Sequence, residues 1–278
     1  MTNFIQGKVI IITGAGGGFG RLIAQKAAAL GGKIVCADID ETGLIETVRS
    51  VRAQGSEASY IVASVAALDQ MQEVAAHAVK THGSIDVMIN NAGTMPLAFF
   101  ADHKAAGDAW SRCIDVNIKG VLNGITCVYD QMMQQGRGHV VNLSSIYGNF
   151  PVVGAGVYGA TKTAVNFLSE SLRVEAQGKI KVTIVKPTGV PGTGLGTGII
   201  NTDAIVGILG QNAASYGGVM ASLAEGNNAP KLRDPDNPQY AALEPTYIAD
   251  AVITAINQPW GVSLGDITIR ATGDGYIL

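Results

Sequence analysis

Short apolar runs alternate with helix-length segments along nearly the whole chain of 278 residues. The runs are rich in β-branched residues and contain few polar positions, which is typical of strands covered on both faces in a parallel sheet. Seven runs fit this description: 8–13, 33–38, 58–63, 84–90, 138–144, 180–186 and 266–270. Their alternation with helical segments predicts a doubly wound α/β fold, with a mostly seven-stranded parallel sheet and helices on both faces.

No internal repeat and no linker divides the chain, so we expect one domain over residues 1–278. Within it, residues 192–229 contain only two charged side chains, Asp203 and Glu225, far below the 15% charged share of the whole chain. The segment is also rich in glycine and aliphatic residues. It is predicted to form a helical, apolar lid over a hydrophobic substrate. A helix pair that contacts another subunit is the alternative.

Composition narrows the class of partner. Hydrophobic residues make up 47% of the chain, which favours a globular core over disorder. The net charge of −3, with no long basic run, argues against nucleic acid as a partner. We expect no membrane partner either, because no apolar run approaches the length that a membrane-spanning helix needs.

The N-terminus lacks the basic start and apolar stretch of a secretory signal, and the three cysteines are too scattered for a disulfide frame. We therefore expect a cytoplasmic protein. The cysteines and the four histidines show no metal-ligand spacing, so no metal is expected.

A glycine-rich stretch, "TGAGGGFG" at residues 13–20, follows the first predicted strand and precedes a helix-like run. Strand, glycine turn and helix start are the context in which a dinucleotide's pyrophosphate meets a helix N-terminus. Glycines 14, 18 and 20 would let the backbone turn tightly and approach the phosphates without a Cβ in the way. The stretch therefore predicts a dinucleotide site.

The second predicted strand follows this glycine turn and its helix, and it ends in Asp38. A carboxylate at that strand end hydrogen-bonds the adenosine ribose hydroxyls and repels a 2′-phosphate. Neither Gly17 in the turn nor Ile39 after the acid offers a cation to that phosphate. We therefore expect NAD rather than NADP.

Tyr158 and Lys162, in "VYGATK", are four positions apart and would share one face of a helix. An ammonium near a phenol favours the phenolate, so we expect the tyrosine's pKa to fall below its usual value of about 10. A phenol tuned in this way can exchange a proton during a reaction.

These motifs, in this order, resemble those of the short-chain dehydrogenase/reductase family over nearly the whole chain. The family's T-G-x-x-x-G-x-G is Thr13–Gly20, and the N-N-A-G after its fourth strand is 90–93. Its helix asparagine matches Asn117 in "DVNIKG". Its strand-end serine matches Ser145 in "VVNLSS", which precedes the stretch that holds Tyr158.

The resemblance implies an NAD-dependent alcohol dehydrogenase or ketone reductase that assembles as a homotetramer or homodimer. Tyr158 would be the acid/base, and Lys162 would lower its pKa and hold the nicotinamide ribose. Ser145 would hydrogen-bond the substrate oxygen, and Asn117 would hold a water that links the lysine to solvent.

The resemblance also implies a wider cofactor site. Its members are Gly14, Gly18, Phe19, Gly20, Asp38, Ile39, Ser64, Val65, Asn91, Ala92, Gly93, Tyr158, Lys162, Pro187, Thr188, Val190 and Thr193. Two stretches depart from the family pattern. Ser64 and Val65 stand where many members carry an aspartate that meets adenine. After the sixth strand the usual P-G-x-x-x-T reads "PTGVPGTG", so either Thr188 or Thr193 could contact the cofactor.

The substrate is expected to be a small hydrophobic, bulky or aromatic secondary alcohol or its ketone. The predicted wall of its pocket is Met95, Ser145, Tyr147, Val153 and Tyr158, together with Ile146 and Val152, which adjoin the motif residues in the sequence. Two other functions remain open: an epimerase or dehydratase that uses transient oxidation, and a catalytically silent NAD-binding regulator. Silent relatives typically lose the serine, tyrosine or lysine, and this chain keeps all three.

Overall fold

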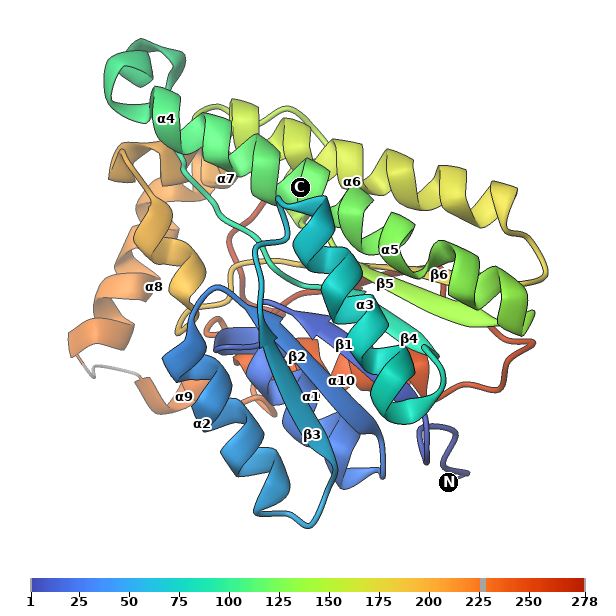
Figure 1. Ribbon diagram of the computed structural model, residues 1–278. Helices are drawn as coiled ribbons and strands as arrows, with labels where there is room; N and C mark the ends of the chain where they lie inside the picture. Colours follow the sequence, from blue (N-terminus) through green and yellow to red (C-terminus); the bar gives the residue numbers. More distant parts are fainter. Residues whose placement is uncertain (1, 226–228, 278) are drawn as a thin grey trace.

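A seven-stranded sheet runs through the centre of the computed structural model, with helices on both of its faces (Figure 1). The structure describes residues 2–225 and 229–277. All strand pairs are parallel, and the strand order is β3-β2-β1-β4-β5-β6-β7. The strands are β1 (Val9–Thr13), β2 (Lys33–Asp38), β3 (Ala58–Val62), β4 (Val87–Asn90), β5 (Gly138–Leu143), β6 (Ile180–Pro187) and β7 (Asp266–Ile269).

Helices connect the strands. The α-helices are α1 (Gly18–Ala29), α2 (Glu41–Arg52), α3 (Leu68–His82), α4 (His103–Ile114), α5 (Gly120–Gln135), α6 (Gly156–Glu175), α7 (Val206–Leu209), α8 (Ala213–Glu225), α9 (Ala229–Arg233) and α10 (Pro245–Ile256). A π-helical turn, η2 (Asp115–Lys119), joins α4 to α5. Short 3-10 turns are η1 (Phe100–Asp102), η3 (Ile146–Gly148), η4 (Gly194–Gly198), η5 (Thr202–Ile205) and η6 (Gly210–Asn212).

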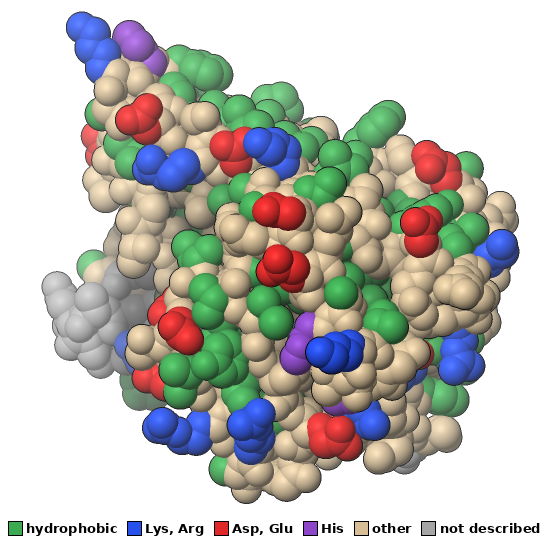
Figure 2. Space-filling view, viewed as in Figure 1, with side chains coloured by type: hydrophobic (Ala, Val, Ile, Leu, Met, Phe, Trp, Pro, Cys, Tyr) green, Lys and Arg blue, Asp and Glu red, His purple; other side chains and the backbone are tan. Residues whose placement is uncertain are grey.

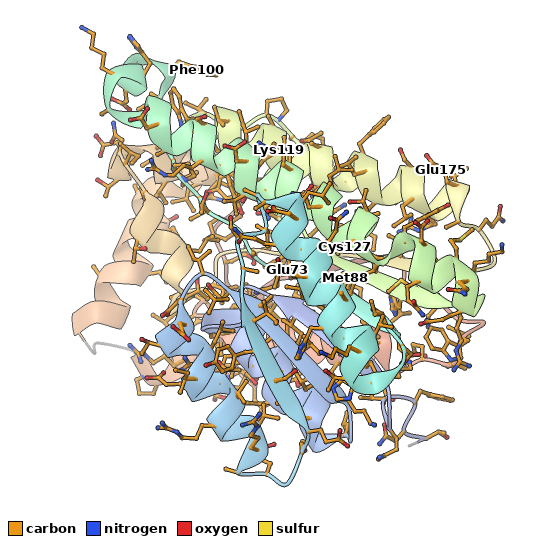
Figure 3. All side chains as sticks on the ribbon, in the orientation of Figure 1. Glu73, Met88, Phe100, Lys119, Cys127 and Glu175 are labelled. Carbon is orange, nitrogen blue, oxygen red and sulfur yellow. The ribbon has the colours of Figure 1, made fainter. Side chains whose placement is uncertain are left out.

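Alternate residues of the strands feed two separate cores, because successive side chains of a strand point to opposite faces. In β1, Ile10 and Ile12 pack with α1, α2 and α10, whereas Val9 and Ile11 pack with α3, α5 and α6. Met88 of β4, labelled in Figure 3, belongs to the second core. Both faces are buried, which explains why the strands read as continuous apolar runs instead of alternating ones.

The doubly wound parallel sheet predicted from these runs is confirmed, and all seven predicted strands form. Their ends differ in places. The fourth strand begins at Val87 instead of Ser84, since the Asp86 side chain accepts the backbone N–H of Val9. The sixth strand extends to Pro187.

The order of the strands fixes where a ligand can bind. The chain reverses direction along the sheet between β1 and β4, which are neighbours. In open parallel sheets the crevice beyond the carboxyl ends of such a pair is the usual ligand site. The glycine turn after β1 and the N-N-A-G stretch after β4 meet there.

The segment predicted as a lid, 192–229, forms short turns and helices from η4 to α8, and its residues 226–228 lie outside the described part. Figure 1 shows α7 and α8 together at one end of the sheet. The buried residues of the segment include Ala204, Ile208, Leu209 and Tyr216.

The described residues, 2–225 and 229–277, include no helix that is long and apolar enough to cross a membrane. On the face seen in Figure 2, positive and negative side chains are interspersed.

Candidate active site

The glycine turn is held by hydrogen bonds and by close backbone contact. Gly14 has a φ of 65°, a conformation that suits glycine. A Cβ on Gly20 would lie 2.1 Å from the carbonyl oxygen of Gly14, so only glycine fits there. From the loop after β4, the Asn91 Nδ2 donates to the carbonyls of Thr13 (2.9 Å) and Gly14 (3.0 Å). The turn is therefore a rigid part of the site.

Helix α1 starts directly after this turn and its N-terminus is open. Its N-cap residue, Gly17, makes no side-chain cap hydrogen bond. The first N–H groups of a helix carry partial positive charge and accept anionic groups such as a pyrophosphate. Gly18 begins the helix, and Phe19 is partly buried against the core of α1, α2 and α10.

Asp38 lies at the end of β2 and faces the turn. Its Oδ2 accepts the N–H of Gly16 at 2.8 Å and its Oδ1 accepts the N–H of Asp40 at 3.1 Å. Two backbone donors therefore fix the orientation of the carboxylate. Ile39 beside it is 74% exposed, which leaves an apolar surface next to the acid.

Ser64 and Val65, which follow β3 at the position where the family meets adenine, are held by polar contacts. The N–H of Ser64 donates to the Gln70 side chain at 2.7 Å, and the carbonyl of Val65 accepts the Asn123 side chain at 2.8 Å. Val65 is buried, whereas Ser64 is half-buried.

The four predicted catalytic residues come from three elements that converge beyond β4 and β5. Ser145 follows β5, and its Oγ accepts the N–H of Tyr147 at 3.2 Å. Tyr158 and Lys162 lie in α6 and are 3% and 5% exposed. The Lys162 Nζ is 5.8 Å from the centre of the Tyr158 ring and donates to the Leu143 carbonyl at 2.8 Å. Burial of all these groups gives a site from which bulk water is excluded.

Burial also sets the ionisation of the site. It raises the pKa of Tyr158 above its usual value, although a hydrogen bond with Ser145 acts in the opposite direction. It lowers the pKa of Lys162 to about 8. The expected lowering of the tyrosine's pKa is therefore wrong for the chain by itself. Loss of hydration on burial disfavours the charged form of both groups and is the largest cause of both shifts.

Asn117 lies in the middle of the π-helical turn between α4 and α5. Its Oδ1 accepts the N–H of Thr94 (2.9 Å), and its Nδ2 donates to the Thr94 carbonyl (3.0 Å) and to Thr161 Oγ1 (3.0 Å). The asparagine therefore ties the loop after β4 to helix α6. Such single π turns are frequent at functional sites. Gly93 lies between these elements, since a Cβ there would be 3.4 Å from Asn117 Oδ1 and 3.6 Å from Lys162 Nζ.

The loop after β6 distinguishes the two candidate threonines. Thr188 is buried and its Oγ1 has no hydrogen-bond partner, whereas Thr193 is half-exposed. A buried hydroxyl without a partner is costly, and a bound cofactor atom would satisfy it. Pro187 ends β6, and Val190 is partly buried against the core of α1, α2 and α10.

The N-N-A-G loop completes the cofactor side. Ala92 follows Asn91, and its N–H donates to Thr13 Oγ1 at 3.2 Å. The loop and the glycine turn are thus joined along the crevice.

The predicted substrate wall is mostly brought together. Met95 and Tyr147 pack in one apolar cluster with Tyr158, and the rings of Tyr147 and Tyr158 meet edge to face at 5.6 Å. Val153 does not belong to this cluster and is 69% exposed. Its neighbour Val152, also predicted for the wall, is buried in this cluster. Sequence does not resolve which of the two points inward in an irregular loop.

The same apolar cluster, which we call the Tyr158 cluster, includes residues of the predicted lid. Its buried members are Leu97, Cys113, Ile146, Val152, Ala155, Tyr158, Ala204, Ile208, Leu209 and Tyr216. None of these buried members is charged.

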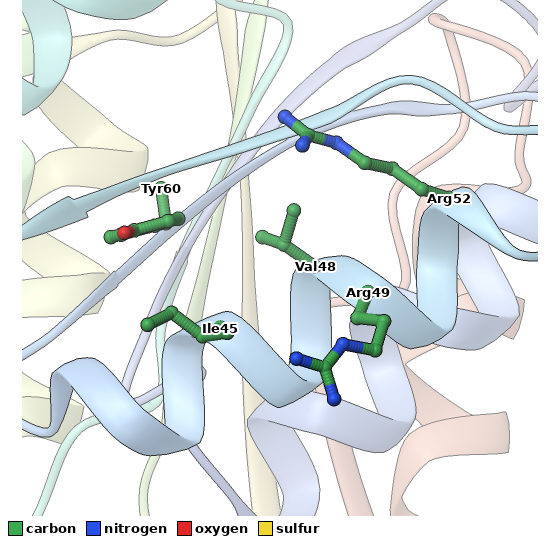
Figure 4. Close-up of a pocket in the computed structure, with 5 residues that line it drawn as sticks. All are labelled: Ile45, Val48, Arg49, Arg52 and Tyr60. Carbon is green, nitrogen blue, oxygen red and sulfur yellow. The ribbon is translucent and has the colours of Figure 1, made fainter.

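Two hollows lie on the surface, and the second borders the Tyr158 cluster through Val152 and Ala155. One, of about 430 Å³, is lined by residues of α2 and β3, and Figure 4 shows Arg49, Arg52 and Tyr60 around it. The other, of about 610 Å³, runs along α6 between Phe100 and Phe150. Neither hollow is lined by the four predicted catalytic residues.

Three residues that contribute to this site escaped the sequence analysis. Thr94 and Thr161 hold Asn117, and Tyr276 packs against the Tyr158 cluster from residues near the end of the described chain. Thr161 stands inside the Y-x-x-x-K stretch itself. No local pattern marks Tyr276.

Comparison with known proteins adds to this geometry. A family model described as short chain dehydrogenase matches residues 8–203, which span the glycine turn, Ser145, Tyr158 and Lys162. The chain belongs to the short-chain dehydrogenase/reductase family. It is an oxidoreductase of that family, and the motifs that carried the resemblance are those that the structure brings together.

Several relatives align with nearly the whole length of the chain. An uncharacterized oxidoreductase of Listeria monocytogenes, Lmo0432, is 32% identical over 98% of this chain and 99% of its own. Among solved structures, a short-chain dehydrogenase/reductase of Burkholderia phymatum in complex with NAD is 29% identical, with a TM-score of 0.75 over 96% of this chain and 90% of its own. A metagenomic short-chain oxidoreductase in complex with NADP is 25% identical, with a TM-score of 0.72 over 97% and 99%.

Proposed function

We propose that the protein is an NAD-dependent dehydrogenase that interconverts a hydrophobic secondary alcohol and its ketone. The observation that carries the proposal is the buried group of Ser145, Tyr158 and Lys162, which opens onto the uncharged Tyr158 cluster. A buried proton donor beside an uncharged apolar wall suits exchange with an alcohol oxygen.

Several features support NAD as the cofactor. The carboxylate of Asp38 would meet the ribose hydroxyls, and its charge disfavours a 2′-phosphate. The cation nearest to the turn in sequence, Arg21, is engaged: its Nη2 donates to the carbonyls of Gly16 and Gly43 and pairs with Glu46 at 2.9 Å. The open start of α1 and the unpartnered Thr188 hydroxyl suit the pyrophosphate and the nicotinamide carboxamide.

In this reaction the bound nicotinamide supplies or accepts the hydride. The chain's own residues would do the rest. The Ser145 hydroxyl would hydrogen-bond the substrate oxygen and orient it towards Tyr158. The Tyr158 hydroxyl would take the proton from an alcohol or give one to a ketone. Lys162 would hold the nicotinamide ribose, and Asn117 would keep the Lys162 helix fixed to the loop after β4.

The apolar wall supports the substrate class. Burial stabilises by roughly 25 cal/mol per Å² of apolar surface, so a bulky or aromatic substrate gains over a two-carbon alcohol before ordering costs. Residues 192–229 would act as the lid that supplies part of this surface.

A panel of alcohols with NAD or NADP, followed at 340 nm, tests the proposal. We expect kcat/KM to rise with the apolar size of the secondary alcohol, and to be low for ethanol, a sugar phosphate and a charged hydroxy acid. A flat series or a preference for the charged member would contradict the substrate class. Higher kcat/KM with NADP would contradict the cofactor. Turnover of none of the alcohols would favour the silent regulator or the epimerase.

We also infer that the protein works as a homodimer or homotetramer in which α6 contacts a second copy. Phe167 and Val174, seven residues apart on α6, are 76% and 73% exposed and share one outward face. Contiguous exposed apolar patches are typical of interaction surfaces. The mass measured by light scattering should be that of a dimer or tetramer, and Phe167→Glu should reduce it. An unchanged mass in that variant would place the contact elsewhere.

A further inference from the structure

Residues 270–277 form a strap that lies across the substrate side of the site. An ion pair between Arg270 and Asp274 (2.6 Å) closes it, and the Asp274 side chain is only 4% exposed. The Tyr276 carbonyl accepts the Arg270 guanidinium at 2.7 Å, and the Tyr276 N–H donates to Asp274 at 3.2 Å. The backbone of Tyr276 is thus fixed by two polar contacts.

The strap is docked onto the predicted lid. The Asn212 side chain donates to the Gly275 carbonyl at 3.0 Å, and the N–H of Ile277 donates to the Ile208 carbonyl at 3.3 Å. A Cβ on Gly275 would lie 2.8 Å from the Tyr216 ring, so the strap approaches α8 as closely as glycine allows. These contacts join residues that are far apart in the sequence.

Two phenol side chains meet where the strap, the lid and the loop after β6 come together. The rings of Tyr216 and Tyr276 are 5.6 Å apart and are tilted at 48° to each other. A Cβ on Gly189 would lie 1.6 Å from the Tyr276 hydroxyl, so this oxygen rests directly on the loop that follows β6.

The tyrosine pair adds two hydroxyl groups to a cluster that is mostly apolar. Leu97, Ile146, Val152, Ile208 and Leu209 form an apolar wall in the same cluster. Burial raises the pKa of both tyrosines, which keeps them neutral hydrogen-bond donors. Neutral donors suit an uncharged oxygen, whereas an anionic group would need a cation to offset its desolvation.

We propose that Tyr216 and Tyr276 form a second polar contact for the substrate, and that they select molecules with an uncharged hydroxyl or keto oxygen beyond the reacting carbon. This inference rests on the proposed dehydrogenase function and narrows its substrate class. The preferred substrate has an apolar skeleton with two separated oxygens, one at Tyr158 and Ser145 and the other at the tyrosine pair. The pair is a specificity determinant and takes no part in the proton exchange at Tyr158.

The test uses secondary diols whose hydroxyls are separated by two to six carbons, each beside the monoalcohol of the same skeleton. The unmodified enzyme should prefer the diol at one separation, by at least about fivefold in kcat/KM and mainly through KM, because a site built to bond an oxygen rejects the analogue that lacks it. In Tyr276→Phe and Tyr216→Phe the ratio of kcat/KM for the diol to kcat/KM for the matching monoalcohol should fall to about one. Each removes one oxygen and keeps the ring, so folding is preserved, and Tm and NAD binding should match the unmodified enzyme.

Tyr247→Phe is the matched control. Tyr247 also packs against a second tyrosine, Tyr240, at 6.2 Å, but it belongs to the core beneath α1 and α10. The Tyr247→Phe variant should therefore show the same diol preference as the unmodified enzyme. If the enzyme oxidises monoalcohols but prefers no diol at any separation, the inference is overturned while the proposed function stands. A diol preference that survives in both Phe variants would overturn the inference in the same way. Equal losses for diols and monoalcohols would also overturn it, since they indicate packing. Failure of the enzyme to oxidise any member would overturn the proposed function.

Discussion

The proposed cofactor side and the proposed substrate side of the site are built from different contacts. On the cofactor side, Asp38 and Asn91 are held by hydrogen bonds to the glycine turn, and Gly20 touches backbone. On the substrate side, residues of the lid enter the Tyr158 cluster through apolar packing and are joined to the strap by hydrogen bonds at Asn212 and Ile208. The two glycines on the exposed face of α8 have open space around them. Polar contacts with fixed geometry tolerate few alternatives, whereas apolar packing tolerates volume-conserving change.

This contrast suits the two tasks of the site, which are to bind the cofactor and to bind the substrate. A dinucleotide is the same molecule in many enzymes, so its side can be rigid and locally encoded. A substrate differs from enzyme to enzyme, and a wall of apolar residues and two phenols can be altered without disturbing the turn.

Tyr158, where the two sides meet, gives the largest expected effect. Tyr158→Phe keeps the ring in its cluster and removes only the proton-transfer group, so turnover should fall ~10²–10⁴-fold while NAD binding stays nearly intact. Steady-state kinetics and NAD titration by fluorescence check the two halves of this statement. Turnover close to that of the unmodified enzyme would remove Tyr158 from the reaction.

Gly20→Ala should disrupt the glycine turn on the proposed cofactor side. The new Cβ would lie 2.1 Å from the Gly14 carbonyl oxygen and 2.8 Å from Asn91 Nδ2, so the backbone of the turn must move. Overpacking of this kind costs roughly 1–3 kcal/mol, and NAD affinity should fall about tenfold or more because the phosphate-binding backbone shifts. Calorimetric titration with NAD measures this affinity in the variant and in the unmodified enzyme. Retained affinity would mean that the turn is not the cofactor site.

Asp38→Ala should weaken NAD binding and narrow the difference in kcat/KM between NAD and NADP. One or two hydrogen bonds to a charged group are lost, each worth about 1.5–3 kcal/mol, and a repulsion of the 2′-phosphate disappears. The ratio of kcat/KM values for the two cofactors is the measurement. Asp69→Ala, at an exposed acid in the first turn of α3, should leave that ratio unchanged. A ratio that moves equally in both variants would reflect general charge.

The two sides also differ in how far sequence could predict them. The strands followed from their apolar runs, and the glycine turn, Asp38 and Asn91 were found because each belongs to a short motif at a strand end. The Y-x-x-x-K spacing placed Tyr158 and Lys162 on one helix. These features depend on neighbours within a few residues, which a sequence displays directly.

The remaining features depend on tertiary contacts. The direction of the Tyr158 pKa shift follows from how completely lid and sheet cover the side chain, and spacing along α6 does not encode that. Tyr276 joins Tyr216 only after residues 270–277 fold back over the lid. Val152 rather than Val153 enters the cluster because an irregular loop lacks the periodicity that fixes inward and outward positions.

Lys162 links the site to the pH dependence of stability. Its pKa is about 8 in the folded protein, below the ordinary 10.5, so the unfolded chain binds more protons between these values. Unfolding free energy should therefore rise with pH across this window, by up to about 3 kcal/mol from Lys162, at 1.36 kcal/mol for each pKa unit. Buried Lys8, with a pKa also lowered to about 8, adds to the same rise.

Lys162→Met should remove part of that rise, since the penalty for burying the ammonium below pH 8 disappears. Denaturant unfolding at pH 7, 8.5 and 10 measures the slope for the variant and for the unmodified protein. Lys104→Met, at an exposed lysine of α4, should keep the full slope. An identical slope in the Lys162 variant would show that the ammonium is hydrated in solution and the site is open to water.

Gly218→Ala is the counterpart of Gly20→Ala on the substrate side and should have the smallest effect, with the opposite sign. Gly218 lies within α8 and is exposed, and a Cβ there would meet no atom within 4 Å. Alanine is favoured over glycine in a helix interior by about 0.8–1.0 kcal/mol, so the unfolding free energy should rise by up to that amount. Urea unfolding provides the value, and kcat/KM should stay within about twofold because no wall residue moves. A loss of stability would mean that α8 needs its glycines for close packing, and the two sides of the site would then be equally constrained.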